Sequence, residues 1–356
     1  MSKQMFVDVH VLQTVPPSCV NRDDTGSPKT AVYGGCTRAR VSSQAWKRAM
    51  RVVFPEIVGE RLVGKRTKRI PELLEEEIAA IDASLPAKKL AREALKLAGV
   101  NVKEKDNKTD ALFFISKEQL KAVAALAAGG CKDKDAFRQA MKEHPSADIA
   151  LFGRMVASEP SLNTDAVAQV AHSISTHAVH NEYDYFTAVD DCAPEDNAGA
   201  GHLGTVEYNS STLYRYATVN VTELARHLGG ESAAVVRGFA EAFIRSMPTG
   251  KQNTFANRTL PDMVYVAVRG DQPINLVGAF EQPVPAGTQG YVQASVRRFV
   301  EYARKVYGTF ADAPEKAYGV GAFDQLESAA EVMPLSRMLS ELESCVEKHV
   351  SGEEVM

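Results

Sequence analysis

Two stretches in which apolar and polar residues alternate constrain the fold of this chain more than any other feature. Residues 6–12 (FVDVHVL) and residues 205–221 (TVEYNSSTLYRYATVNV) both alternate with a period of two. Successive side chains of a β-strand point to opposite faces of the sheet, so this pattern predicts strands with one buried face. We therefore expect a domain built on a β-sheet.

Segments with the helical spacing of apolar residues lie between and after these strands. The helices of residues 59–158 are expected to form an insertion, and the remaining helices to cover one side of an antiparallel sheet, which makes the predicted class α+β. Helices are predicted at residues 43–54, 72–85, 88–98, 117–128, 134–143, 165–177, 232–247, 292–306 and much of 323–350, and further strands at 148–156 and 263–269.

The composition is that of an ordinary globular protein. Of the 356 residues, 45% are hydrophobic and 24% are charged, and no apolar stretch has the length of a membrane span. The first residues, MSKQMFVDVHVLQ, lack the apolar core of a signal peptide, so we expect a cytoplasmic protein with no membrane contact. The five cysteines show no C-x-x-C spacing, which argues against disulfides and a zinc knuckle.

Residues 38–54 (RARVSSQAWKRAMRVVF) begin with a strand pattern that carries two arginines. Arg38 and Arg40 alternate with apolar residues, so we expect both side chains to leave the strand on one side. A serine then follows at a position suited to cap a helix, and Pro55 is expected to end that helix after Phe54.

The predicted helix has two different faces. Trp46, Ala49, Met50 and Val53 share one face, which is expected to pack on a core. Spacings of three and four residues place a second set on the opposite face: Gln44, Lys47, Arg48 and Arg51. Cations and an amide presented together suit a chain of phosphates, although a solvated basic face is the plainer alternative.

The net charge of −4 argues against a nucleic-acid-binding protein, but the charge is unevenly distributed. Residues 38–69 are rich in lysine and arginine and contain only two acidic residues, Glu56 and Glu60. Acidic residues gather instead at 72–77 and 341–354. A basic face on an acidic body can hold an anion, and it can equally dock on the acidic face of another copy.

A projecting hairpin is predicted around residue 195. An apolar run at 183–189 is followed by a segment rich in glycine, proline and acids, and then by the long alternating strand. Residues 199–204 (GAGHLG) match G-x-G-x-x-G, but a dinucleotide site needs a strand before this motif and a helix within it. We therefore reject nucleotide binding and expect the glycines to give the hairpin tip its freedom.

Three histidines lie close together in the sequence. His172, His177 and His180 could hold zinc or manganese with Asp184 and the pair Asp190–Asp191. The separation of five residues between His172 and His177 is poor for one helical face, so packing and helix-end roles are the preferred interpretation. No P-loop, catalytic triad or H-E-x-x-H motif is present, and no metal or cofactor is predicted.

Several motifs, taken together, resemble one family. The resemblance covers nearly the whole chain, and only residues 59–144 match weakly. In order along the chain, the following runs look like CasC, the repeated backbone subunit of the type I-E CRISPR Cascade complex in the RAMP superfamily: FVDVHVL, PSCVNRDD, YGG before RARVSSQ, DIALFGRM, AHSISTH, YFTAVDD, HLGT, YRYA and KQ-x-T.

This resemblance implies an RRM-like (ferredoxin-like) palm with a helical fingers insertion and a projecting β-hairpin thumb. The palm would comprise residues 1–58 and 213–356, the fingers residues 59–178 and the thumb residues 179–212. It also implies that the protein is not an enzyme. Copies would bind CRISPR RNA head to tail, contact other Cascade subunits and leave the guide bases free to pair with target DNA.

The resemblance also implies roles for individual residues. Those expected to contact the guide RNA are Arg22, Arg38, Arg40, Ser42, Gln44, Lys47, Arg48, Arg51, Met155, Lys251 and Gln252. Those expected to wedge between bases are Tyr185, Phe186, Thr187 and Leu203. An alternative remains, because related CRISPR backbone subunits cut RNA with a thumb-loop aspartate. Asp190, Asp191 and Asp196 are then candidates for a metal-dependent ribonuclease.

Overall fold

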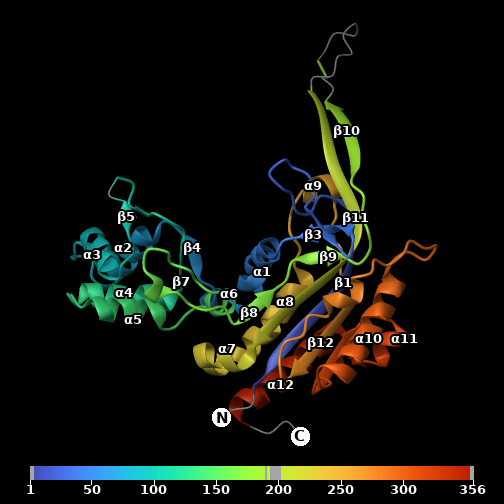
Figure 1. The fold of residues 1–356 in the computed structure, drawn as a ribbon. Helices are drawn as coiled ribbons and strands as arrows, with labels where there is room; N and C mark the ends of the chain where they lie inside the picture. The colour runs from blue at the N-terminus through green and yellow to red at the C-terminus, as the bar shows by residue number, and fades with distance from the viewer. Residues whose placement is uncertain (1–3, 104, 189–190, 193–201, 353–356) are drawn as a thin grey trace.

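A computed structural model describes residues 4–103, 105–188, 191–192 and 202–352 of the chain (Figure 1). The strands are β1 (Phe6–Ser18), β2 (Thr30–Tyr33), β3 (Cys36–Val41), β4 (Lys65–Thr67), β5 (Val102–Lys103), β6 (Lys108–Thr109), β7 (Phe113–Ile115), β8 (Ala168–Val170), β9 (Ser173–Ser175), β10 (Glu182–Ala188), β11 (His202–Asn220), β12 (Met263–Arg269), β13 (Lys316–Val320) and β14 (Glu331–Val332). The helices are α1 (Ser43–Val58), α2 (Ile70–Ile81), α3 (Ala87–Leu97), α4 (Lys117–Ala128), α5 (Lys134–Lys142), α6 (Ala147–Phe152), α7 (Val221–Leu228), α8 (Ser232–Arg245), α9 (Gln252–Phe255), α10 (Val292–Thr309), α11 (Asp324–Glu327) and α12 (Leu335–Ser351). The predicted α+β class is confirmed, and none of the helices within the described ranges is long and apolar enough to cross a bilayer.

One large sheet organises the chain. Its strands follow the order β14-β13-β12-β1-β11-β9-β3-β2, and β8 also pairs with β11. The pairs are antiparallel except for β13 and β14, which run parallel. The two strands predicted from alternation, β1 and β11, lie side by side in the middle, with Val9 opposite Ala217.

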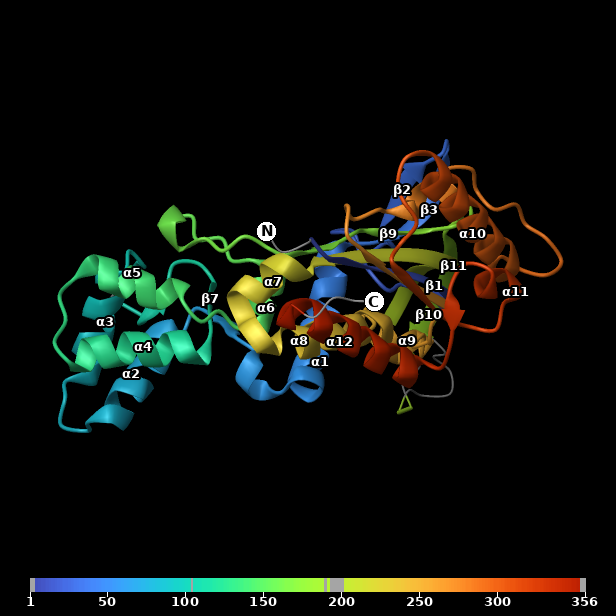
Figure 2. The same cartoon turned by 90° about the horizontal axis from the view of Figure 1, so that it is seen from below.

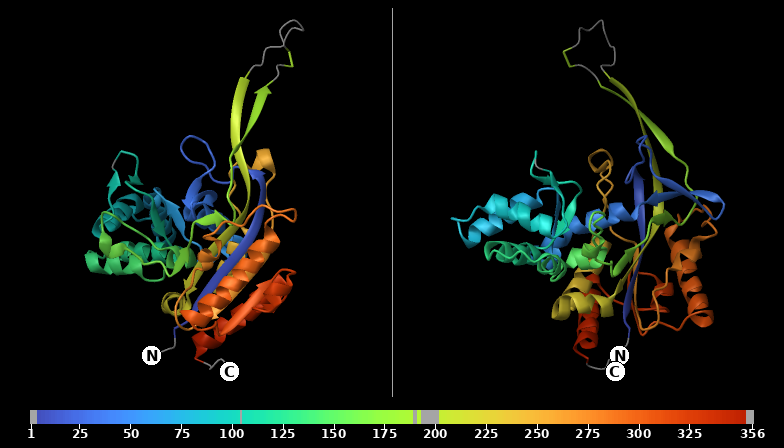
Figure 3. Two further views of the ribbon diagram at one scale, coloured as in Figure 1. Left: turned by 45° about the vertical axis from the view of Figure 1, so that its right-hand side comes forward. Right: turned by 60° about the vertical axis from the view of Figure 1, so that its left-hand side comes forward.

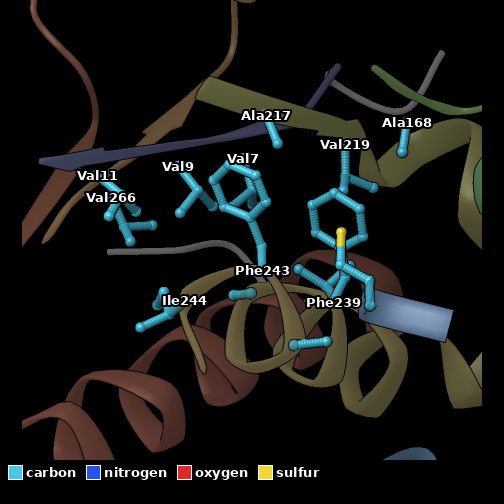
Figure 4. Close-up of a cluster of buried hydrophobic side chains, with 14 of the residues drawn as sticks. Val7, Val9, Val11, Ala168, Ala217, Val219, Phe239, Phe243, Ile244 and Val266 are labelled. Carbon is cyan, nitrogen blue, oxygen red and sulfur yellow. The ribbon is translucent and has the colours of Figure 1, made fainter. Parts of the chain in front are cut away.

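Both faces of the sheet are covered, so the expectation of helices on one side only is wrong. On one face, the valines of β1 pack on Phe239 and Phe243 of α8, with α12 beyond (Figure 4). On the other face, Tyr265 of β12 packs on Phe299 of α10, with ring centroids 5.4 Å apart. Figure 2 shows the two helical layers on either side of the strands. The second layer was hard to anticipate because this face of the central strands mixes aliphatic residues such as Leu12 with tyrosines and a histidine.

Helices α2 to α5 form a separate helical region beside the sheet (Figures 1 and 3). They have their own apolar cluster, in which Leu74, Leu120 and Phe137 are buried. A capping box begins α4: the Ser116 hydroxyl accepts from Gln119 N–H (3.0 Å), and the Gln119 side chain accepts from Ser116 N–H (3.1 Å).

A two-stranded hairpin of β10 and the first part of β11 projects from the sheet (Figures 1 and 3). Strand β11 has 19 residues and pairs first with β10 and then with β1. The projecting hairpin is therefore a direct continuation of a central strand. The glycine-rich tip at residues 193–201 lies outside the described residues.

Three sequence predictions are wrong. Residues 147–152 form α6 instead of a strand, because so short an apolar run shows no period that separates a buried helix from a buried strand. Residues 165–177 contain β8 and β9 instead of a helix, because they pair with β11, which lies far along the chain. Helix α1 continues through Pro55 to Val58 and ends at Gly59, whose φ is 88°.

Candidate nucleic-acid interface

Helix α1 is fixed at its first turn and along its buried face. The Ser42 hydroxyl accepts a hydrogen bond from Ala45 N–H (3.3 Å), so Ser42 is the N-cap and its side chain is used within the protein. Trp46 is fully buried, and its indole N–H donates to the Ser173 hydroxyl of β9 (3.0 Å). The predicted core face of α1 is confirmed, and its polar face is presented outwards.

A groove of about 780 Å³, which we call the first groove, runs between α1 and the helical region. Its lining combines cations with the aromatic rings of Phe114 and Phe152, and Arg66 of β4 adds a further cation. The structure brings five of the predicted residues together here: Gln44, Lys47, Arg48, Arg51 and Met155. Met155 is 84% exposed, so it presents its thioether at the rim.

The cations of the first groove differ in their surroundings. The Lys47 ammonium lies 5.6 Å from the centroid of the Phe152 ring, and partial burial lowers the pKa of this lysine. Arg51 forms an ion pair with the buried Asp148 (3.0 Å) and lies over the Phe114 ring at 4.4 Å. Arg48 is exposed. Among its accessible cations the first groove therefore offers the exposed Arg48 and Arg66, and also Lys47 and Arg51, which contact aromatic rings.

A second groove, of about 860 Å³, lies on the other side of α1. Its floor is apolar, and Arg22, Gln252 and Arg258 line it together with Arg48, which borders both grooves. Asp23 also lies here, but its carboxylate accepts hydrogen bonds from Thr25 and Ser27. These bonds stabilise the turn that follows Asp23. The second groove thus gathers three arginines from separate parts of the chain.

Lys251 stands at the edge of the second groove. It precedes α9 and has a left-handed backbone with a φ of 50°, which turns the chain sharply before Gln252. Such backbone is costly for a residue with a side chain, so the surrounding turn must hold it. The sharp turn places Gln252 beside Arg22 and Arg48 in the groove lining.

Arg40 and Arg38 were both expected to contact guide RNA, and this expectation does not fit the position of Arg38. Its side chain is fully buried, and its guanidinium donates to the carbonyl oxygens of Ser175 (2.9 Å) and Phe280 (2.9 Å). Arg38 therefore joins β3 to β9 and to the segment before α10. Arg40 is half-buried; its Nε donates to Thr30 O (3.0 Å), and its Nη1 lies 3.2 Å from His172 Nδ1.

The hairpin carries exposed apolar side chains on both of its faces. Tyr185 (63% exposed) pairs with Thr205, and Thr187 pairs with Leu203 (55% exposed) on the same face. Phe186 lies on the other face, opposite Gly204. The four predicted wedge residues are thus adjacent in space but divided between two faces.

The alternative sites find little geometric support among the residues that can be described. His177 is buried, its ring stacks on Tyr291 at 3.6 Å, and its Nε2 accepts from Thr212 N–H (3.1 Å). No three side chains of His, Cys, Asp or Glu gather as metal ligands anywhere in the described ranges. Asp191 is exposed beyond the end of β10, whereas Asp190 and Asp196 lie outside the described residues.

Three arginines of the groove linings were not among the predicted site residues: Arg66, Arg154 and Arg258. Arg66 belongs to the basic run at 38–69, so the charge pattern was a signal that could have identified it. Arg258 has no such signal, because it reaches the second groove only through the fold. Arginine and lysine side chains around an aromatic-lined groove can bind a phosphate backbone, and exposed aromatics on a projecting ribbon can stack on bases.

Comparisons with known proteins agree with this architecture. A sequence model of the CT1975-like proteins matches residues 7–347. The chain belongs to the CT1975-like protein family. No match is found among curated protein sequences.

Two solved structures show how closely this CT1975-like chain resembles known assemblies. One chain, from a structure titled "CRISPR RNA-guided surveillance complex, pre-nicking", is 31% identical with a TM-score of 0.76, and the match covers 95% of this chain and 100% of that one. A second, from a structure titled "CRISPR RNA-guided surveillance complex", is 29% identical with a TM-score of 0.62, and the match covers 94% and 99% of the two chains. Both similarities therefore extend over nearly the whole chain.

Proposed function

We propose that this protein is a non-catalytic subunit that binds CRISPR RNA in the backbone of a Cascade-type surveillance complex, of the kind that CasC forms in type I-E systems. The observation that carries this proposal is the pair of arginine-rich grooves on the two sides of α1, below a projecting hairpin with exposed aromatic residues. The full-length similarity to chains of CRISPR RNA-guided surveillance complexes supports it.

In this proposal the sheet acts as an RRM-like palm formed by residues 1–58 and 213–356. Residues 59–178 act as fingers. Cations of the two grooves hold guide phosphates, a mode of binding that is independent of sequence. The guide bases then remain free to pair with target DNA, so that base pairing and not the protein reads the sequence.

The hairpin within residues 179–212 acts as a thumb. Tyr185 and Leu203 offer apolar surface on one face of a ribbon that is narrow enough to enter between neighbouring nucleotides. Copies of the chain bind head to tail along the guide. A repeated heterologous contact that does not close generates an open helix, and other subunits of the complex bind to this backbone.

The test is to purify the chain and measure its 260/280 nm absorbance ratio and its size before and after ribonuclease treatment. We expect a large assembly that contains RNA and falls apart on digestion. A nucleic-acid-free monomer that binds no added CRISPR RNA would refute the proposal. Magnesium-dependent cleavage of bound RNA, lost on substitution of Asp191, would instead favour the ribonuclease alternative.

A further inference from the structure

The carboxylate of Asp148 lies where three segments of the chain meet. It is fully buried in α6, a short helix whose Ala150 and Leu151 belong to the core of the sheet. Its Oδ1 accepts hydrogen bonds from Gly64 N–H (2.8 Å) and from the Ser146 hydroxyl (2.7 Å). Its Oδ2 accepts from Arg51 Nε (3.0 Å) in α1. One buried charge is therefore satisfied by donors from three directions.

Two of these donors mark the crossings between the sheet and the helical region. Gly64 directly precedes β4 on the way out, and Ser146 directly precedes α6 on the way back. A Cβ on Gly64 would lie 2.6 Å from the Ser146 hydroxyl and 2.9 Å from the Ile115 carbonyl oxygen. The outgoing and returning segments are therefore packed too closely to admit a side chain at residue 64. Because both bond to the same carboxylate oxygen, Asp148 sets the direction in which the helical region leaves the sheet.

The third donor, Arg51, is held on two sides. Its Nε edge is bound by Asp148, and its guanidinium lies over the Phe114 ring at 4.4 Å. The side chain is 25% exposed and lines the first groove. An arginine on a helix surface ordinarily loses considerable rotamer entropy when it binds a ligand, whereas a guanidinium that is already held loses less.

A buried ion pair gives little net stability, because desolvation of the two charges offsets their attraction. An apolar replacement for Asp148 would nevertheless leave Gly64 N–H and the Ser146 hydroxyl without the acceptor that they share. The ion pair also has a second consequence, because it holds a partly exposed arginine, Arg51, in the lining of the first groove.

We propose that Asp148 is a positioning residue for RNA binding: it orients Arg51 toward the first groove and fixes the helical region against α1, which sets the width of that groove. This inference rests on the proposed function, since the ligand is the phosphate backbone of single-stranded RNA. The phosphate contacts the accessible edge of Arg51, while Asp148 touches only protein.

Two variants test the inference in the full chain. Asp148→Asn keeps an acceptor for Gly64 and Ser146 but removes the ion pair. Arg51→Lys keeps the positive charge but cannot hold Asp148 and face the groove at the same time. The matched control is Asp271→Asn, which breaks the ion pair with Arg269 (2.7 Å) far from both grooves.

Two readouts are needed. The first is the affinity of each folded variant for a mixed-sequence single-stranded RNA of 30 nucleotides in a series of salt concentrations. The second is the distance distribution between spin labels on α4 and α12, without RNA. Lys117→Cys and Ser340→Cys, both exposed, carry the labels after Cys36, Cys131 and Cys192 are replaced by serine.

We expect Asp148→Asn to broaden the distance distribution and to weaken RNA binding about tenfold, and Arg51→Lys to weaken binding by a similar factor although the charge is unchanged. Asp271→Asn should alter neither. If Asp148→Asn does not fold, Arg51→Lys carries the test. Wild-type affinity in either folded variant, or an unchanged distance distribution in Asp148→Asn, would overturn the inference. If the wild-type chain binds no RNA, the proposed function fails, while the label distances still test the positioning of the helical region.

Discussion

Phe186 lies directly across the hairpin from Gly204, so closely that a Cβ on Gly204 would come within 2.5 Å of Phe186 Cζ. The ring therefore rests on the backbone of the opposite strand. The close approach of this aromatic side chain favours a glycine there, whereas the backbone angles do not demand one.

Gly204→Ala should displace the Phe186 ring. Because the hairpin is exposed, we expect the free energy of unfolding to change by less than about 1 kcal/mol, while the affinity for guide RNA falls several-fold. Chemical denaturation and RNA titration measure the two effects. Gly230→Ala is the matched control, since its Cβ would meet no neighbouring atom. Wild-type affinity in Gly204→Ala would argue against a role of this hairpin face in binding.

Arg48 borders both grooves, so its removal should weaken the binding of RNA in either groove. We expect Arg48→Ala and Lys47→Ala to weaken the binding of single-stranded RNA uniformly across sequences, and each to reduce the slope of log K against log salt concentration by about one. Arg297→Ala, an exposed arginine of α10, should change neither quantity. Slopes equal to that of the wild type in both variants would exclude phosphate contacts along α1.

Arg215 is a buried cation in the core of the sheet. Its guanidinium lies 3.8 Å from the Trp46 ring centroid and 4.6 Å from that of Phe243, and it donates to Gln13 Oε1 (2.6 Å). Burial lowers the pKa of Arg215 to about 9. We expect Arg215→Ala to reduce the free energy of unfolding by about 3–5 kcal/mol, because it leaves a cavity and unpaired acceptors. Guanidinium denaturation would measure this, and a loss below about 1 kcal/mol would contradict it.

His177 should make the protein less stable in mild acid. Burial, aided by the charge of Arg38, lowers the pKa of His177. Below its unfolded pKa of about 6.5 the unfolded chain binds the proton more readily than the folded one, so the free energy of unfolding falls with decreasing pH, by at most about 1.4 kcal/mol per unit. Protonation would also place a hydrogen on Nε2, so that two donors, Nε2–H and Thr212 N–H, would face each other and their hydrogen bond would be lost.

The variant His177→Gln isolates this effect, since glutamine can still accept from Thr212. His10, whose pKa burial lowers to about 3, and Asp8, whose pKa burial raises to about 6, titrate in both proteins and with opposite effects on stability. Denaturation midpoints at pH 7, 6 and 5 should fall less in the variant than in the wild type. Parallel curves would show that His177 contributes nothing to the acid sensitivity.

The sequence predicted best those elements whose limits are set by neighbouring residues. The strand Met263–Arg269 and the helix Lys117–Ala128 have the predicted bounds, because alternation and the Ser116–Gln119 capping box act within a few residues. Segments whose structure depends on a distant partner were predicted wrongly. Residues 168–170 and 173–175 are strands because they pair with β11, and the second of these strands also pairs with β3.

The candidate site shows the same division. The polar and apolar faces of α1 follow from spacing alone. The burial of Arg38 does not, because its acceptors at Ser175 and Phe280 come from segments far along the chain. The ion pair of Arg51 with Asp148 could not be predicted from spacing either. The helical spacing places Arg51 on the solvent-facing side of α1, but its Nε bonds to a buried carboxylate.

The unbroken course of β11 has an evolutionary consequence. Because its 19 residues run from the core of the sheet into the hairpin, the orientation of every side chain on the hairpin is fixed by its count from the sheet. An insertion of one residue in β11 between the sheet and the hairpin would exchange the face of Leu203 with that of Gly204, whereas a matched insertion of two in each strand would leave both in place. Among homologous chains, hairpin length should therefore vary by even numbers of residues per strand, even where the sequence of the hairpin has diverged.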